Sequence, residues 1–205
     1  MRGSAGTTTA GAAPRHAVSP VLAAALLVLP LSLMALAALP ARAVVFHAKD
    51  EALALAFPGA DRVESRRFIL TDAQKAEVEK LARAPLESQL WTVYVGWRDT
   101  ELLGYAVIDT QIMRTLPATF MVVLTPAGEV RRIEVLAFHE PPEYMPTARW
   151  TQQFAGRMLD EDLALRAGIQ GITGATLSAT ALTTGVRRIL ALHKVLGPEL
   201  SLREK

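Results

Sequence analysis

The feature that most constrains the fold is a run of four β-rich segments in the middle of the chain. The segments are rich in Val, Ile, Tyr, Trp and Thr, and they cover residues 91–97, 102–110, 119–125 and 129–138. The connections at 98–100 and 126–128 are so short that they leave room only for hairpin turns. The pattern predicts an antiparallel meander of about four strands.

Two helices are expected before this meander. Residues 49–57 can form a short helix that ends at Pro58-Gly59. Thr71 and Gln74 have the spacing of a capping box, in which a hydroxyl at the N-cap is paired with an amide three residues later. We therefore expect a second helix over residues 72–84, with Pro85 ending it.

Two more helices are expected after the meander. Trp150, Phe154 and Met158 recur every four residues, which predicts a helix over 147–165. A last helix should run from about 175 to 195, with Gly197-Pro198 as its stop signal. The residues expected on its inward face are Leu182, Val186, Ile189 and Leu190. The expected fold class is α+β, an antiparallel sheet flanked by helices.

The N-terminal 43 residues have the features of an export signal. Residues 1–20 are polar with a basic character, residues 21–39 carry no charge, and Ala41-Arg42-Ala43 fits the small-x-small pattern of a cleavage site. The prediction is a signal peptide over 1–43 and a domain over 44–205. An uncleaved membrane anchor is the alternative, because about 20 apolar residues can span a bilayer. Both readings locate the domain outside the cytoplasm, in the periplasm.

Charge and cysteine content exclude several kinds of function. Residues 44–205 contain 19 basic and 20 acidic side chains, so the domain offers no basic face for a nucleic acid. The chain has no cysteine, which excludes disulfides, thiolate zinc sites, iron–sulfur clusters and thioether-linked haem. A redox role would therefore require an organic cofactor.

A turn before the last predicted helix combines two glycines with three hydroxyl groups. The glycines are Gly171 and Gly174, and the hydroxyls belong to Thr173, Thr176 and Ser178. Free backbone N–H groups at a helix N-terminus, together with the helix dipole, form an anion site. The residues alone leave two interpretations open, a phosphate-binding turn or a threonine N-cap without any ligand.

The same turn resembles a known motif. Thr173-Gly174-Ala175-Thr176, followed by Leu177-Ser178, is similar to the flavinylation motif of FMN-binding-domain proteins. That family includes the extracytoplasmic subunits of ion-pumping ferredoxin and quinone oxidoreductase complexes of bacteria. The resemblance covers most of residues 55–196, and its further segments are "FPGAD" at 57–61, "LTDAQ" at 70–74, Gly104-Tyr105, "VVLTPAGEVRRIEVL" at 122–136 and "HEPPEY" at 139–144.

The resemblance implies a cofactor and a set of site residues. In the family, a flavin transferase esterifies the FMN phosphate to the last threonine of the motif, which is Thr176 here. Thr173, Gly174, Ala175 and Leu177 would shape the phosphate turn, with Ser178 as a further donor. One position departs from the family, because Gln170 stands where an acidic residue usually lies six positions before the modified threonine. Covalent and non-covalent FMN binding therefore both remain open.

The loop after the last strand has three interpretations. His139, Glu140 and Glu143 can form a solvated loop or suggest a metal site, although no second histidine lies at ligand spacing. The resemblance adds that the loop borders the flavin, with Glu140 as the contact.

The function that these features favour is electron transfer, in which bound FMN takes electrons from one exported or membrane-bound partner and passes them to another. No residue is assigned a catalytic role and no metal site is expected. The alternatives are an exported, non-redox module that binds a phosphorylated or acidic ligand, and a flavin reductase that acts on a diffusible substrate.

Overall fold

A computed structural model describes residues 44–45 and 48–200 as one antiparallel sheet with helices on both faces. The six strands lie in the order β1-β6-β5-β4-β3-β2. Their bounds are β1 (Val44–Val45), β2 (Arg62–Ile69), β3 (Leu90–Arg98), β4 (Glu101–Ile112), β5 (Pro117–Leu124) and β6 (Val130–Phe138). The helices are α2 (Lys49–Ala56), α3 (Asp72–Ala82), α4 (Ala148–Thr151), α5 (Thr176–Leu200) and the 3-10 turns η1 (Pro142–Tyr144) and η2 (Gln152–Phe154).

The predicted meander is confirmed as β3 to β6, and the fold class is α+β. The sheet also contains β2, which the β-rich pattern does not reveal because this edge strand carries three arginines and a glutamate. Charged residues are common on edge strands, where they discourage pairing with other chains. Arg66 is nevertheless buried. Its Nη1 donates at 2.8 Å to the carbonyl of Leu200, which is the last residue of α5.

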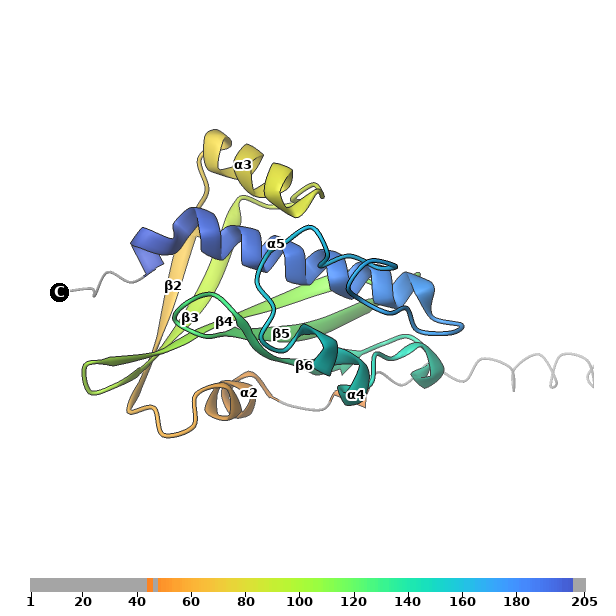
Figure 1. Ribbon diagram of the computed structural model, residues 1–205. Helices are drawn as coiled ribbons and strands as arrows, with labels where there is room; N and C mark the ends of the chain where they lie inside the picture. The colour runs from red at the N-terminus through yellow and green to blue at the C-terminus, as the bar shows by residue number, and fades with distance from the viewer. Residues whose placement is uncertain (1–43, 46–47, 201–205) are drawn as a thin grey trace, which may run out of the picture. The chain divides into compact units, whose positions relative to one another are not determined.

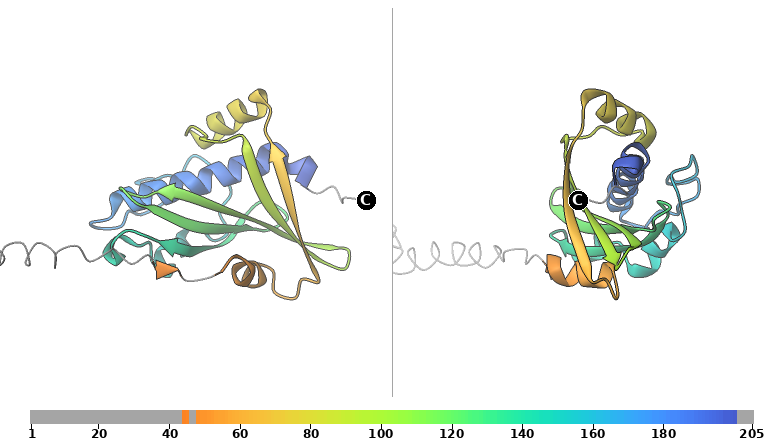
Figure 2. Two further views of the ribbon diagram at one scale, coloured as in Figure 1. Left: turned by 180° about the vertical axis from the view of Figure 1, so that it is seen from behind. Right: turned by 90° about the vertical axis from the view of Figure 1, so that its left-hand side faces the viewer.

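The two faces of the sheet carry separate cores (Figures 1 and 2). The long helix α5 crosses one face, and α3 packs on α5. The core on this face includes the four residues predicted to face inward from the last helix, Leu182, Val186, Ile189 and Leu190, each at most 2% exposed. The short helix α2 covers part of the opposite face with Leu53 and Phe57.

The capping box at the start of α3 is confirmed. The Thr71 hydroxyl accepts from the N–H of Gln74 at 3.2 Å, and the Gln74 side chain accepts from the N–H of Thr71 at 3.0 Å. The helix ends at Ala82, two residues earlier than expected, because Arg83 adopts a left-handed conformation with φ of 56°.

The helix predicted over 147–165 is wrong for most of its length. Only α4 and η2 form, and the chain then leaves the helix at Gly156, whose φ is 74°. There the N–H of Gly156 donates to the carbonyl of Val130 at 2.8 Å, and the N–H of Val130 donates to the carbonyl of Arg157 at 2.9 Å. Pairing with β6 thus replaces the helical hydrogen bonds, and Met158 is exposed rather than part of an inward stripe.

The stop signal predicted at Gly197-Pro198 is also wrong, because α5 continues to Leu200. A side chain before proline disfavours the helical conformation, and Gly197 has none. Leu200 is 1% exposed, and its carbonyl accepts the hydrogen bond from the Arg66 guanidinium. Burial and this hydrogen bond together stabilise the final turn.

The predicted signal or anchor over 1–43 lies outside the described residues. Among the residues that are described, no helix combines the length and apolarity needed to cross a membrane.

The sheet divides into two parts at one end. β3 and β4 pair only between Val93↔Val107 and Arg98↔Glu101. Beyond Val93, β3 stays paired with β2 as far as Leu90, and beyond Val107, β4 stays paired with β5 as far as Ile112. The two strand pairs therefore diverge, as Figure 1 shows, and the edges at 90–92 and 108–112 do not pair with each other.

Candidate functional site

The start of α5 is a turn without a side-chain cap. Gly174 has a φ of 79°, a conformation that favours glycine, and it leads into Ala175. The carbonyl of Ala175 accepts the first helical hydrogen bond, from the N–H of Ala179 at 3.1 Å, so Ala175 occupies the N-cap position. The alternative in which Thr173 or Thr176 serves as the N-cap is therefore wrong, because α5 begins with Thr176 itself.

This turn offers several unused hydrogen-bond donors. The N–H groups of Thr176, Leu177 and Ser178 have no acceptor within the described chain, and they lie at the positive end of a 25-residue helix. Thr173 and Thr176 are exposed, and a Cβ added at Gly174 would meet nothing within 4 Å. The surroundings of the turn are therefore open to a ligand.

Ser178 differs from the two threonines because its side chain is fully buried. Its Oγ has no hydrogen-bond partner in the described part of the chain. An unpaired buried hydroxyl costs stability, of the order of 1–3 kcal/mol, unless a ligand or water satisfies it. The free N–H groups and the exposed hydroxyls are donors of the kind that bind a phosphate group, and the buried Ser178 hydroxyl is a further donor without a partner among the described residues.

The segment before the turn is held in place by the short helices. The indole N–H of Trp150 donates to the carbonyl of Gln170 at 2.7 Å, and the N–H of Gln170 donates to the side chain of Gln153 at 2.8 Å. Trp150 and Phe154 pack edge to face in the core. The backbone of Gln170 is thus fixed, whereas its side chain is exposed.

Glu140 is engaged in a different task from the one that the resemblance implies. Its Oε1 accepts from the N–H groups of Arg114, Thr115 and Leu116 at 3.1, 2.6 and 2.8 Å, in the turn between β4 and β5. These bonds, led by that of Thr115, hold the pKa of the Glu140 carboxyl below its ordinary value. The structure therefore gives Oε1 of Glu140 a role in holding the β4–β5 turn. The flavin contact of Glu140 that the resemblance implies stays a prediction.

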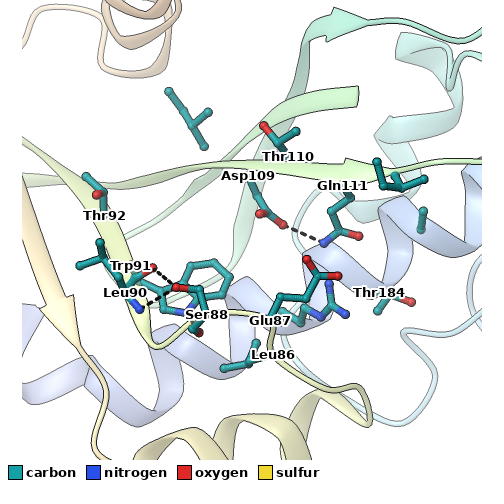
Figure 3. Close-up of a pocket in the computed structure, with 14 residues that line it drawn as sticks. Leu86, Glu87, Ser88, Leu90, Trp91, Thr92, Asp109, Thr110, Gln111 and Thr184 are labelled. Atoms are coloured by element: carbon teal, nitrogen blue, oxygen red, sulfur yellow. Dashed lines mark hydrogen bonds between the residues drawn. The ribbon is translucent and has the colours of Figure 1, made fainter. Parts of the chain in front are cut away.

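A notch opens where β3 and β4 diverge (Figure 3). It has a volume of about 530 Å³, and its walls come from the segment before β3, from the end of β4 and from α5. Residues that line it include Trp91 on β3, Asp109 on β4, and Ala181, Thr184 and Arg188 on α5. The volume lies in the range of pockets that bind small molecules and cofactors.

The polar groups of the notch include a carboxylate on a strand. Asp109 Oδ2 accepts from Gln111 Nε2 at 2.7 Å, as Figure 3 shows. Burial raises the pKa of the Asp109 carboxyl, and the nearby Glu87 raises it further, while the Gln111 hydrogen bond and Arg188 act in the opposite direction. The Nε of Arg188 is buried and has no hydrogen-bond partner among the described residues.

The sequence interpretation missed Asp109 and Arg188. A signal for Asp109 exists, since it has the same alternation phase as the buried Tyr105 and Val107 on one strand. From the sequence, Arg188 is only a cation that complements the C-terminal half of the helix dipole. Its place in the notch depends on α5 lying beneath the split in the sheet, which no local pattern reveals.

The described residues contain no group of three or more His, Asp or Glu side chains close enough to hold a metal ion. The turn before α5 and the notch are two features of the described chain that suit a ligand. Both are built on α5, the notch from residues one to three turns beyond Thr176.

Comparisons with known proteins point to one cofactor. Residues 116–191, which contain the turn and Glu140, match the family described as the FMN-binding domain. A curated relative from Acetobacterium woodii, one of the subunits of the Na⁺-translocating ferredoxin:NAD⁺ oxidoreductase complex, is 26% identical over 140 residues. The aligned part covers 58% of this chain and 64% of that relative. The resemblance to FMN-binding-domain proteins predicted from the sequence is thus confirmed, and the cofactor that the match indicates is FMN.

Proposed function

We propose that the protein is an electron carrier that works outside the cytoplasm and holds FMN by its phosphate at the start of α5. The observation that carries this proposal is the uncapped helix start at Ala175, which lies within the segment that matches the FMN-binding domain. A phosphate there can accept from the N–H groups of Thr176, Leu177 and Ser178, and its negative charge is favoured by the helix dipole.

We further propose that the flavin is esterified to Thr176. The hydroxyl of Thr176 is on an exposed first-turn residue, which makes it accessible to a flavin transferase. Thr173, Gly174 and Ala175 form the preceding turn, and the buried Ser178 hydroxyl is a further donor toward the phosphate. A tether of this kind keeps the flavin from diffusing away in an open compartment, because it raises the effective concentration of the ring at its site.

The notch between β3 and β4 is the position that we propose for the flavin ring. Ala181, Thr184 and Arg188 follow Thr176 by about 7, 12 and 18 Å along the helix axis, at 1.5 Å per residue. FMN, with a five-carbon ribityl chain and a three-ring system, has an extended length of the same order. FMN supplies reversible one- and two-electron chemistry, and the residues of the notch would orient its ring and exclude water.

Residues 1–43 support a location outside the cytoplasm, and the relative supports a redox protein as partner. The basic start, the uncharged segment and the small-x-small site support export, with either cleavage or retention as an anchor. The relative is a subunit of a Na⁺-translocating ferredoxin:NAD⁺ oxidoreductase complex. We accordingly propose an exported or membrane-bound redox protein as the partner for this chain.

The test is co-expression of the chain with a flavin transferase, followed by denaturing electrophoresis under ultraviolet light. We expect a fluorescent band that disappears in Thr176→Ala and persists in Thr180→Ala, the matched change at an exposed threonine one turn further along α5. Gln170→Asp should increase the fluorescent fraction if the transferase reads a carboxylate at this position.

Three outcomes separate the parts of this proposal. A yellow native protein without a fluorescent band would refute the ester and keep FMN binding. A fluorescent band that survives Thr176→Ala would assign the ester to another residue. A native protein that is colourless after incubation with FMN would overturn the flavin proposal and favour a non-redox binding module.

A further inference from the structure

The carboxylate of Asp109 points into the notch and has a neutral amide, not a cation, as its side-chain hydrogen-bond partner. Asp109 lies on the α5 side of β4, in phase with the core residues Tyr105 and Val107. Gln111, two residues later on the same side, donates to Oδ2 at 2.7 Å and so fixes the orientation of the carboxyl group. Such a hydrogen bond gives Asp109 a defined direction without cancelling its charge.

Two charged side chains face Asp109 from the other walls of the notch. Arg188 comes from α5, and Glu87 comes from the segment between α3 and β3. The Asp109 carboxyl is no salt-bridge partner of Arg188, because no N···O distance of 4.0 Å or less is present between them. The Arg188 Nε is buried without a partner among the described residues. The notch therefore holds a guanidinium N–H with no partner there, together with a carboxylate whose side-chain partner is the neutral amide of Gln111.

The edges of the divided sheet add further polar groups. Because β3 and β4 separate beyond Val93 and Val107, the backbone of 108–112 that faces the notch pairs with no described strand on that side. The pyrimidine-like edge of a flavin ring presents carbonyl acceptors and an N–H donor, which match an unpaired strand edge and a guanidinium. The notch is therefore suited to a flat ring with one polar edge.

We propose that Asp109 contacts the flavin ring in this notch and takes up a proton when the ring is reduced. The inference rests on the proposed function, since it requires FMN to be bound, and it identifies Asp109 as a positioning and potential-setting residue. Asp109 and the notch walls on β3 and β4 lie outside residues 116–191, so the family match does not assign them.

The charge balance explains why Asp109 would respond to reduction. Reduction by two electrons from a reduced redox partner, with one proton from solvent bound by the ring, would add one negative charge beside the Asp109 carboxylate. Asp109 then binds one proton from solvent at a carboxylate oxygen, and it returns that proton to solvent when the two electrons leave to the acceptor. Burial raises the pKa of this carboxyl, and added negative charge on the ring would raise it further, so reduction would favour uptake of the proton.

The experiment is a redox titration of the FMN-loaded full chain at several values between about pH 5 and pH 8. Asp109→Asn removes the negative charge and keeps the size of the side chain. We expect the equilibrium constant for flavin reduction to rise at least tenfold at the upper end of this range, which is about 30 mV for a two-electron couple. The difference should shrink as the pH falls, because protonation of Asp109 removes its charge in the wild-type protein. The visible spectrum of the flavin should also shift in the variant.

Two variants serve as controls. Glu101→Gln removes the same charge from an exposed residue at the opposite end of β4, outside the notch, and it should change the equilibrium constant less than threefold. Asp109→Glu keeps a carboxyl group, and we expect it to retain the pH dependence of the wild type even if the asparagine variant fails to fold.

The possible failures are distinguishable. A yellow Asp109→Asn protein with an unchanged spectrum, potential and pH dependence would overturn the role of Asp109 while FMN binding stands. If neither variant folds, the wild-type protein alone decides. A wild-type reduction potential that depends on pH no more steeply than that of free FMN would then overturn the role of Asp109. A colourless wild-type protein would instead refute the proposed function.

Discussion

One oxygen of Glu140 holds together two segments that are far apart in the sequence. It accepts from three consecutive backbone N–H groups at 114–116, while the guanidinium of Arg114 stacks 3.9 Å from the ring centre of Tyr144. Both contacts join the β4–β5 turn to the loop after β6. A carboxylate that accepts several N–H bonds is strongly favoured in its charged form, which is why the pKa of Glu140 is lowered.

This linkage predicts how stability depends on pH. Because the pKa of Glu140 is lower in the folded state than in the unfolded state, the stabilisation is fully present above the unfolded value of about 4.3. It should be lost as the pH falls through the folded value. Glu140→Gln should therefore lower the melting temperature at pH 7 and weaken its dependence on pH in the acid range, as followed by circular dichroism.

The control for this experiment is Glu143→Gln, the same chemical change at an exposed glutamate of the same loop. It should leave the melting temperature at pH 7 nearly unchanged. Equal effects of the two substitutions would show that the hydrogen bonds of Glu140 contribute no specific stability.

The sequence identified Glu140 as a residue of interest but not its contacts. The resemblance drew attention to "HEPPEY", yet the N–H groups that Glu140 binds lie about 25 residues earlier. They become neighbours only because β4, β5 and β6 pair as a meander, so that the β4–β5 turn and the end of β6 meet. The start of the last helix at Thr176 was easier to predict, since glycines, hydroxyls and a helix start are all local.

At the scale of elements, α5 is packed so closely against the sheet that one position tolerates no side chain. A Cβ at Gly185 would lie 2.5 Å from Phe120 Cζ and 2.7 Å from Gln111 Nε2. Gly185 therefore sets the distance between α5 and β4–β5, and through Gln111 it also affects the side chain that orients Asp109.

Gly185→Ala is consequently expected to destabilise the protein. Helix propensity alone would favour alanine by about 1 kcal/mol, whereas overpacking typically costs about 1–3 kcal/mol. The ring of Phe120 is 1% exposed and packed in the core, so we expect a net loss of up to about 2 kcal/mol in the free energy of unfolding. Urea denaturation of the purified variant measures this difference.

A double-mutant cycle checks the assigned cause. Phe120→Leu removes the Cζ atom that the new methyl group meets, so Gly185→Ala should cost less in the Phe120→Leu background than in the wild type. Additive effects of the two substitutions would mean that the contact with Phe120 is not the source of the loss.

The sequence predicts some of the helices and strands correctly and others not, and the difference has physical reasons. Strongly patterned segments such as α3, α5 and β3 to β6 could be recognised from local signals. The apolar spacing of Trp150, Phe154 and Met158 was misleading, because hydrogen bonds between Gly156, Arg157 and Val130 outweigh the helical alternative. The strand β2 was missed since its one fully buried residue is the charged Arg66, and charged residues fill half of its positions.

For the whole molecule, the proposed ligand should stabilise the fold. Any molecule that binds only the folded state adds about 2.7 kcal/mol at a concentration 100-fold above its dissociation constant. For a domain of this size, 1 kcal/mol corresponds to a shift of about 2–4 °C, so FMN at that excess should raise the melting temperature by roughly 5–10 °C. Differential scanning fluorimetry without a transferase measures non-covalent binding alone.

Riboflavin is the matched control for this shift, because it contains the ring and the ribityl chain but no phosphate. It should raise the melting temperature clearly less than FMN does, since the donors at the start of α5 then have no anion to bind. An equal shift for both compounds would argue that the turn at Gly174–Thr176 takes no part in binding.

Because the turn and the notch are both built on α5, the number of helical residues between them fixes their separation. A helix is rigid, and each residue adds a fixed 1.5 Å and a rotation of about 100°. The separation between the phosphate end and Thr184 is therefore counted in residues, and a single insertion between Thr176 and Ala181 would turn the first residues away from the notch by more than a quarter of a circle. If FMN spans from the turn to the notch, the size of the cofactor limits the length of this stretch, whereas exposed side chains such as that of Leu177 can vary.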